Sequence, residues 1–230
     1  MLGVALAGLL SAGCSTVALT LADPGPQQTQ TRTVGAVSAV ELAASGDLVL
    51  SRGDAPSLRI TAGRNVLRHL TSEVRGDRLT LGSDGSLRRT GQVRYDLVLP
   101  AARVVELSGS GDVHVTAPSA VQQVSLPGSG DIRIDGLRTD ALRVDLAGSG
   151  HIAVAGSTTR QRLSIDGSGE YSAAGLTSRD AEVTISGSGD ADVAVSRTLT
   201  VTISGSGSVT YRGNPTVTRS ITGSGDVVGR

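Results

Sequence analysis

Apolar and polar residues alternate with a period of two around a recurring tripeptide, Gly-Ser-Gly, in the second half of the chain. The first glycines of its copies are Gly109, Gly128, Gly148, Gly167, Gly187, Gly205 and Gly223. Successive copies lie 18 to 20 residues apart, which indicates one structural unit built repeatedly. Positions four and two before the first glycine, and four and six after it, are apolar in nearly every copy. This pattern predicts a strand on each side of a Gly-Ser-Gly bend.

A unit of this length is too short for a helix and a strand with two loops, but it fits one coil of a β-solenoid. Stacked coils would place equivalent apolar residues above one another, with strands about 4.7–4.9 Å apart. A second glycine column, eight residues after the first, is expected to mark the other corner: Gly136, Gly156, Gly175 and Gly213. An antiparallel sandwich or a propeller remains an alternative, because two units together approach the length of a propeller blade.

The region before the repeats is strand-rich but less regular, and we divide the chain on that basis. We expect a signal peptide over residues 1–14, a flexible tether over 15–33, an irregular β segment over 34–100 and a solenoid of about seven coils over 101–230. Expected strands in the irregular segment are 39–43, 47–51, 57–62, 78–81 and 93–99, with a helical turn or loop at 65–70. This segment would cap one end of the solenoid, as solenoids require.

The other end of the solenoid has no cap sequence. Arg219 and Gly229 replace apolar residues in the last unit. An uncovered solenoid end exposes strand edges that can pair with another chain. We therefore expect that the solenoid ends can mediate self-association.

Composition narrows the classes of function. The formal net charge is zero, all 21 basic residues are arginine, and no basic patch with interleaved aromatic residues suggests nucleic-acid binding. Aromatic residues make up 1% of the chain, with neither Phe nor Trp. A narrow stack of aliphatic residues has no need of aromatic side chains, which agrees with the solenoid.

The N-terminus carries a candidate anchor. The apolar stretch at residues 3–10 is too short to span a membrane and suits a signal peptide. It is followed by Ser11-Ala12-Gly13-Cys14, which resembles the lipobox of bacterial lipoproteins. That resemblance implies acylation of Cys14 and a membrane partner. Ser15 rather than Asp follows the cysteine, which favours the outer membrane of a Gram-negative cell.

Residues 34–230 resemble a bacterial family of unknown function, the autotransporter-adhesin head domain or GIN domain. The residues that carry the resemblance are the junction Tyr95-Asp96-Leu97-Val98-Leu99-Pro100, the following segment from Val104 to Asp112, and the serial Gly-Ser-Gly coils. The resemblance implies a right-handed parallel β-helix-like fold, all-β, in an envelope protein. It brings no catalytic residues.

A column of polar residues follows the corners and is the first candidate for chemistry. Three residues after each first glycine lie Asp112, Asp131, His151, Glu170, Asp190, Ser208 and Asp226. A calcium ladder is one interpretation, but the calcium-binding nonapeptide spacing is absent. We favour the alternative that each aspartate accepts a hydrogen bond from an N–H near the bend.

A polysaccharide-active enzyme is the second alternative. Asp112, His114 and Arg133 would share an outward face and could perform acid–base chemistry. A solvated polar face explains them more simply, and His69, His114 and His151 lack metal-ligand spacing. We therefore expect no catalytic residue, cofactor or metal. The expected function is adhesion, binding or scaffolding in the envelope, with a surface polymer, a glycan or another envelope protein as partner.

Overall fold

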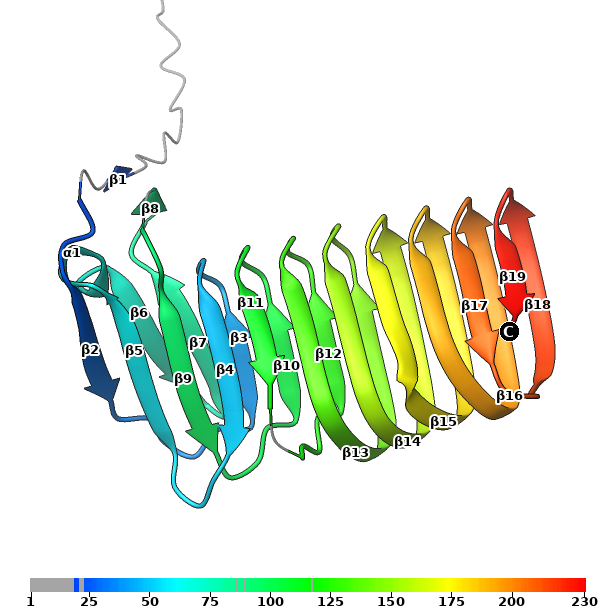
Figure 1. The fold of residues 1–230 in the computed structure, drawn as a ribbon, viewed down its shortest axis with the longest axis horizontal. Helices are drawn as coiled ribbons and strands as arrows, with labels where there is room; N and C mark the ends of the chain where they lie inside the picture. Colours follow the sequence, from blue (N-terminus) through cyan, green and yellow to red (C-terminus); the bar gives the residue numbers. More distant parts are fainter. Residues whose placement is uncertain (1–18, 21–22, 86, 89, 117) are drawn as a thin grey trace, which may run out of the picture.

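The computed structural model describes residues 19–20, 23–85, 87–88, 90–116 and 118–230. The predicted signal peptide and Cys14 lie outside these residues. The described chain forms an elongated rod of stacked strands with one short helix at one end (Figure 1). No helix within the described ranges is long and apolar enough to cross a membrane.

The strands stack into a β-solenoid, as the repeat predicts. Their bounds are β1 Leu19–Thr20, β2 Gln27–Arg32, β3 Ala39–Leu42, β4 Asp47–Arg52, β5 Ser57–Gly63, β6 Leu70–Arg75, β7 Arg78–Ser83, β8 Leu87–Arg88, β9 Arg94–Leu99, β10 Val104–Leu107, β11 Asp112–Val115, β12 Gln123–Leu126, β13 Asp131–Leu146, β14 His151–Gly167, β15 Glu170–Gly187, β16 Asp190–Gly205, β17 Ser208–Arg212, β18 Thr216–Gly223 and β19 Asp226–Gly229. The helix α1 spans Arg64–Leu67.

Two layers of strands enclose the core. Layer A contains β6, β7, β3, β10, β12, the second halves of β13 to β16, and β18. Layer B contains β2, β5, β9, β4, β11, the first halves of β13 to β16, β17 and β19. Each of β13 to β16 bends at the lower corner and passes from layer B to layer A (Figure 1).

The predicted apolar columns form the core. Equivalent residues pair in register, for example Val144 with Leu163 and Ile165 with Ile185, and their side chains are buried. The last coil departs as its sequence indicates: Arg219 is exposed, and Ile221 is 36% exposed. Alternation with period two therefore places one face of every strand between the layers.

Glycine is required at the Gly-Ser-Gly corners mainly because successive coils approach closely. A Cβ on the first glycine Gly128 would overlap the carbonyl oxygen of Gly109 in the coil before it. Left-handed backbone contributes only at some corners, such as Gly187 and Gly205 with φ of 136° and 139°. The second glycine column does lie at the lower corner, where Gly136 has φ of 67° beside a register shift between β13 and β14.

The segment before residue 100 continues the rod. Strands β3 and β4 form a coil whose residues pair in parallel with β10 and β11, Ala39 with Val104 and Asp47 with Asp112. Strands β7 and β9 pair in parallel with β3 and β4 on the other side. The coil that comes first in the sequence thus lies between two coils that come later.

Antiparallel strands close this end of the rod. Strand β5 pairs with β2 and β9, and β6 pairs with β7, all antiparallel. All five strands expected in the irregular segment are present. The helix α1 at residues 64–67 overlaps the helical turn or loop expected at 65–70, and Leu70 of that segment begins β6. Residues 27–32, predicted as the end of a flexible tether, instead form β2, because their Gln/Thr run pairs with β5. Strand β6 was not predicted.

Candidate binding surface

The outer face of layer A is a continuous surface whose composition changes along the rod. Strand register defines its central column: Thr80, Glu41, Glu106, Ser125, Asp145, Ser164, Thr184, Thr202 and Ser220. The core columns beneath keep one residue class, whereas this outer column passes from carboxylates to hydroxyls. The scaffold is therefore repeated, and the exposed side chains are not.

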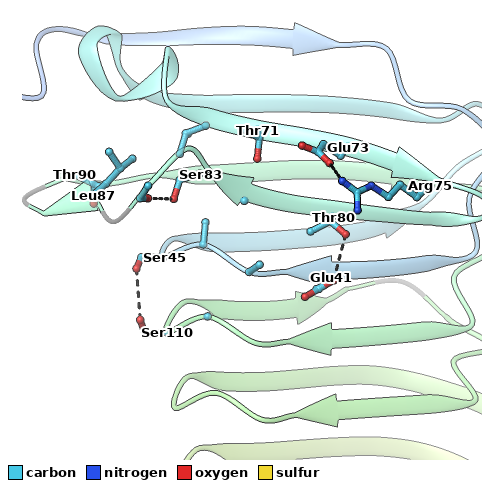
Figure 2. A pocket seen from close by; sticks show the side chains of 16 residues that line it. Glu41, Ser45, Thr71, Glu73, Arg75, Thr80, Ser83, Leu87, Thr90 and Ser110 are labelled. Atoms are coloured by element: carbon cyan, nitrogen blue, oxygen red, sulfur yellow. Dashed lines mark hydrogen bonds and ion pairs between the residues drawn. The ribbon is translucent and has the colours of Figure 1, made fainter. Parts of the chain in front are cut away.

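A groove hollows this face at the capped end of the rod. Its cavity of about 930 Å³ lies over β6, β7 and β3 and extends to the corner residues Ser45 and Ser110. Figure 2 shows Thr71, Glu73 and Thr80 beside it, with Thr90 at the connection around β8. The groove forms here because layer A changes from stacked coils to the hairpin of β6 and β7.

Hydrogen bonds fix the acidic floor of the groove. Glu41 accepts hydrogen bonds from Thr80 Oγ1 at 3.2 Å and from Ser108 Oγ at 2.8 Å. Arg78 Nη1 lies 2.7 Å from Glu106 Oε2 and 3.5 Å from Glu41 Oε2. The bond to Glu106 raises the pKa of the Arg78 guanidinium. The carboxylates are thus charge-compensated and oriented.

The rim of the groove carries a more exposed ion pair. Arg75 Nη2 lies 2.8 Å from Glu73 Oε2, and the two side chains are 86% and 56% exposed. Exposed pairs of this kind contribute little to stability, so both groups are available to a ligand.

Ion pairs between arginines and carboxylates dominate the middle of the face, around a second hollow of about 690 Å³. Arg162 Nη2 lies 2.5 Å from Glu182 Oε2 in the next coil. Arg197 donates to both carboxylate oxygens of Asp180, at 2.7 and 2.6 Å. These bonds, with one from Thr198, lower the pKa of Asp180 to about 2.

Hydroxyl side chains predominate at the far end of the face, beside the carboxylates Asp180 and Glu182 of β15. Ten hydroxyl side chains cover it: Thr184, Ser186, Thr198, Thr200, Thr202, Ser204, Thr216, Thr218, Ser220 and Thr222. We call this area the hydroxyl face. It lies on the second halves of β15 and β16 and on β18, at the end of the rod opposite the cap (Figure 1).

The predicted acidic column lies on the outer side of layer B and stacks in register. His151 pairs with Asp131 and Glu170, and Asp47 extends the column beyond Asp112. Asp112 Oδ1 accepts a hydrogen bond from Asp131 N at 3.1 Å. Asp190 accepts from Ser208 N in the same way. These carboxylates bond the next coil. Within the described ranges, no cluster of three or more His, Cys, Asp or Glu residues could hold a metal ion.

The structure brings together Asp112, His114 and Arg133, the residues considered for acid–base chemistry, around a hollow of about 290 Å³. It adds a carboxylate that the sequence reasoning missed. Asp135 lies 2.9 Å from His114 Nε2 and 3.0 Å from Arg133 Nη2. The bonds from His114 and Arg133 lower the pKa of Asp135, which makes it a poor general acid. The sequence could have indicated Asp135, because a residue two positions after Arg133 in a strand lies on the same face of the sheet.

Solved structures share this fold. A putative adhesin from Bacteroides fragilis aligns with a TM-score of 0.82 and 20% identity, over 89% of this chain and 97% of its own. A putative lipid binding protein from Parabacteroides distasonis aligns with a TM-score of 0.78 and 24% identity, over 92% and 100%. A putative adhesin from Parabacteroides merdae gives 0.67 and 20%, over 92% and 98%.

No curated protein matches the chain. Residues 37–215, which include β3 to β17, match a family defined by its sequence. The match begins inside the cap and covers most of the solenoid. The chain belongs to the family described as putative auto-transporter adhesin, head GIN domain.

Proposed function

We propose that the protein is a non-catalytic binding module of the cell envelope, anchored by a lipid at Cys14, which presents the outer face of layer A to its ligand. One observation carries the proposal: the outer column from Thr80 to Ser220 varies from coil to coil, above core columns that stay apolar in every coil before the last. Solenoids use such extended surfaces for binding. An adhesin-like family also points to a protein of the cell envelope or surface.

The hydrogen bonds and ion pairs of the carboxylates support binding over catalysis. Glu41 in the groove is held by Thr80 and Ser108 and lies near Arg78. Asp135 on layer B has a lowered pKa. General acid catalysis near neutral pH needs a carboxyl group whose pKa is raised instead. These groups are suited to fixed electrostatic contacts with a ligand.

The course of the chain supports an anchor at the capped end. Leu19 and Thr20 in β1 pair with β8, in the connection beside the groove. Only four residues separate Cys14 from Leu19, and the five residue steps between them span at most roughly 18 Å in an extended chain. A lipid at Cys14 would hold the cap near the outer membrane and leave the hydroxyl face as the far end.

The anchor is tested by metabolic labelling with radioactive palmitate in the wild type and in Cys14→Ser. Label in the wild type alone, together with loss of membrane association in the variant, is the expected result. Equal labelling of both chains, or of neither, would refute anchoring at Cys14.

Binding without turnover is tested with purified peptidoglycan, lipopolysaccharide and capsular polysaccharide. The full chain should co-sediment with or retain at least one polymer and release no product from it. The groove variant Glu73→Gln/Arg75→Ala should weaken retention if the polymer reaches the groove. Release of product by the wild type would overturn the non-catalytic assignment.

A further inference from the structure

The hydroxyl face differs from the rest of the same layer in charge and in bonding. Nearer the cap, arginines and carboxylates pair across coils, as Arg162 and Glu182 do. On the hydroxyl face, Thr198 donates to Asp180. The other nine hydroxyls form no side-chain hydrogen bond within the part of the chain that the structure describes. Their hydrogen-bonding capacity faces solvent.

The backbone orders these hydroxyls into a lattice. Thr184, Thr202 and Ser220 are register partners in adjacent strands, which lie about 4.7–4.9 Å apart. Along each strand the outward residues repeat every second position, about 6.6–6.8 Å apart. Seven of the ten are threonines, which have few χ1 rotamers because they are β-branched. The array is thus preformed and loses little side-chain freedom on binding.

The chemistry of the array selects its ligand. Each hydroxyl both donates and accepts hydrogen bonds. The ten hydroxyls carry no charge, and the carboxylates at their edge, Asp180 and Glu182, are already paired with Arg197 and Arg162. Tyr95 and Tyr171 are buried, so neither offers a stacking platform for a single sugar ring. Affinity must come from many weak contacts made together, which requires a long ligand of repeating hydroxyls.

We propose that the hydroxyl face binds neutral polysaccharide through multiple hydroxyl contacts along extended chains. The inference rests on the proposed binding function and names its ligand class. It places the recognition surface at the end of the rod away from the anchor, where a polymer outside the membrane is accessible.

The test uses the full chain in detergent and two insoluble neutral polysaccharides, cellulose and chitin, in co-sedimentation. The variant Thr200→Val/Thr202→Val/Thr218→Val removes three hydroxyls and keeps β-branched side chains of similar shape. The control Thr159→Val/Thr177→Val/Thr210→Val makes the same chemical change outside the face. Valine favours strands as threonine does, so thermal unfolding should confirm that both variants fold.

We expect the wild type to bind at least one of the two polysaccharides, the face variant to bind at least tenfold more weakly, and the control to bind within twofold of wild type. Failure of the wild type to bind either polysaccharide, or unchanged binding by the face variant, would overturn the inference. Retention of the wild type on another envelope polymer would leave the proposed function standing in that case.

Discussion

Gly111 and Gly130 lie directly above one another in successive corners of the solenoid. The carbonyl oxygen of Gly111 occupies the place that a Cβ on Gly130 would need. The same relationship recurs between Gly130 and Gly150 in the next coil. The second glycine of each Gly-Ser-Gly is therefore set by contact between coils, and any side chain there would force the coils apart.

Gly130→Ala should destabilise the fold by about 1–3 kcal/mol, the usual range for overpacking a closely packed site. Urea unfolding followed by circular dichroism measures the change. Gly35→Ala is the matched control, since no atom lies within 4 Å of its built Cβ, and it should change stability by less than about 0.5 kcal/mol. Equal effects at both positions would contradict the role of coil contact.

The two fully buried tyrosines should respond differently to loss of the hydroxyl. Tyr171 donates to Gln161 Oε1 at 3.2 Å, whereas the hydroxyl of Tyr95 has no partner among the described residues. Tyr171→Phe should cost about 1–3 kcal/mol, because it leaves a buried acceptor unpaired. Tyr95→Phe should be neutral or stabilising. Denaturant unfolding of both variants checks this, and a larger loss for Tyr95→Phe would contradict it.

The sequence predicts the solenoid better than its cap. Apolar positions such as Val144 and Ile165 recur in every coil with the same alternation. The strands predicted from that alternation therefore agree closely with the structure. Strand β6 forms a hairpin with the adjacent β7, whereas β2 is polar and exposed along most of its length and is ordered by pairing with β5, which is distant in sequence. No local pattern encodes such pairing.

The candidate surface was predicted less well for the same reason. The acidic column was visible in the sequence, because the Gly-Ser-Gly period aligns it. The groove depends on Glu73 of the β6–β7 hairpin and on Glu41 of β3. They line the same cavity because β7 pairs with β3, a strand that lies far before it in the sequence. Asp135 meets His114 between adjacent coils. The period of the repeat sets Arg133 beside His114, but it does not show which side chains bond, and it does not encode the groove.

Asp180→Asn should lower the melting temperature at pH 7. It should also remove the part of the pH dependence of the melting temperature that we expect Asp180 to give the wild type. Bonds from Arg197 and Thr198 lower the pKa of Asp180 from 3.8 to about 2. A carboxylate with a lowered folded pKa stabilises the folded state above its unfolded pKa, and this contribution is lost as the pH falls through the folded value. The difference between wild type and variant should therefore shrink from pH 4 to pH 2, as measured by thermal unfolding. Asp140→Asn, at a neighbouring exposed carboxylate, is the control and should follow the wild type.

Arg219→Val should promote self-association through the far end of the rod, the contact that the sequence suggests. Arg219 pairs with Val201 in register and occupies a column that is apolar in the coils before it. Among the described residues, strand β18 pairs with β16 alone, and a charge on an edge strand opposes pairing with another copy. Valine would continue the core column, so the dissociation constant of a dimer should fall by roughly tenfold, which corresponds to about 1.4 kcal/mol. Sedimentation equilibrium of the full chain measures the change.

Arg179→Val, an exposed substitution at the lower corner, should leave the wild-type behaviour unchanged. An Arg219→Val chain that associates no more than the Arg179→Val control would show that the solenoid end is not a contact between copies.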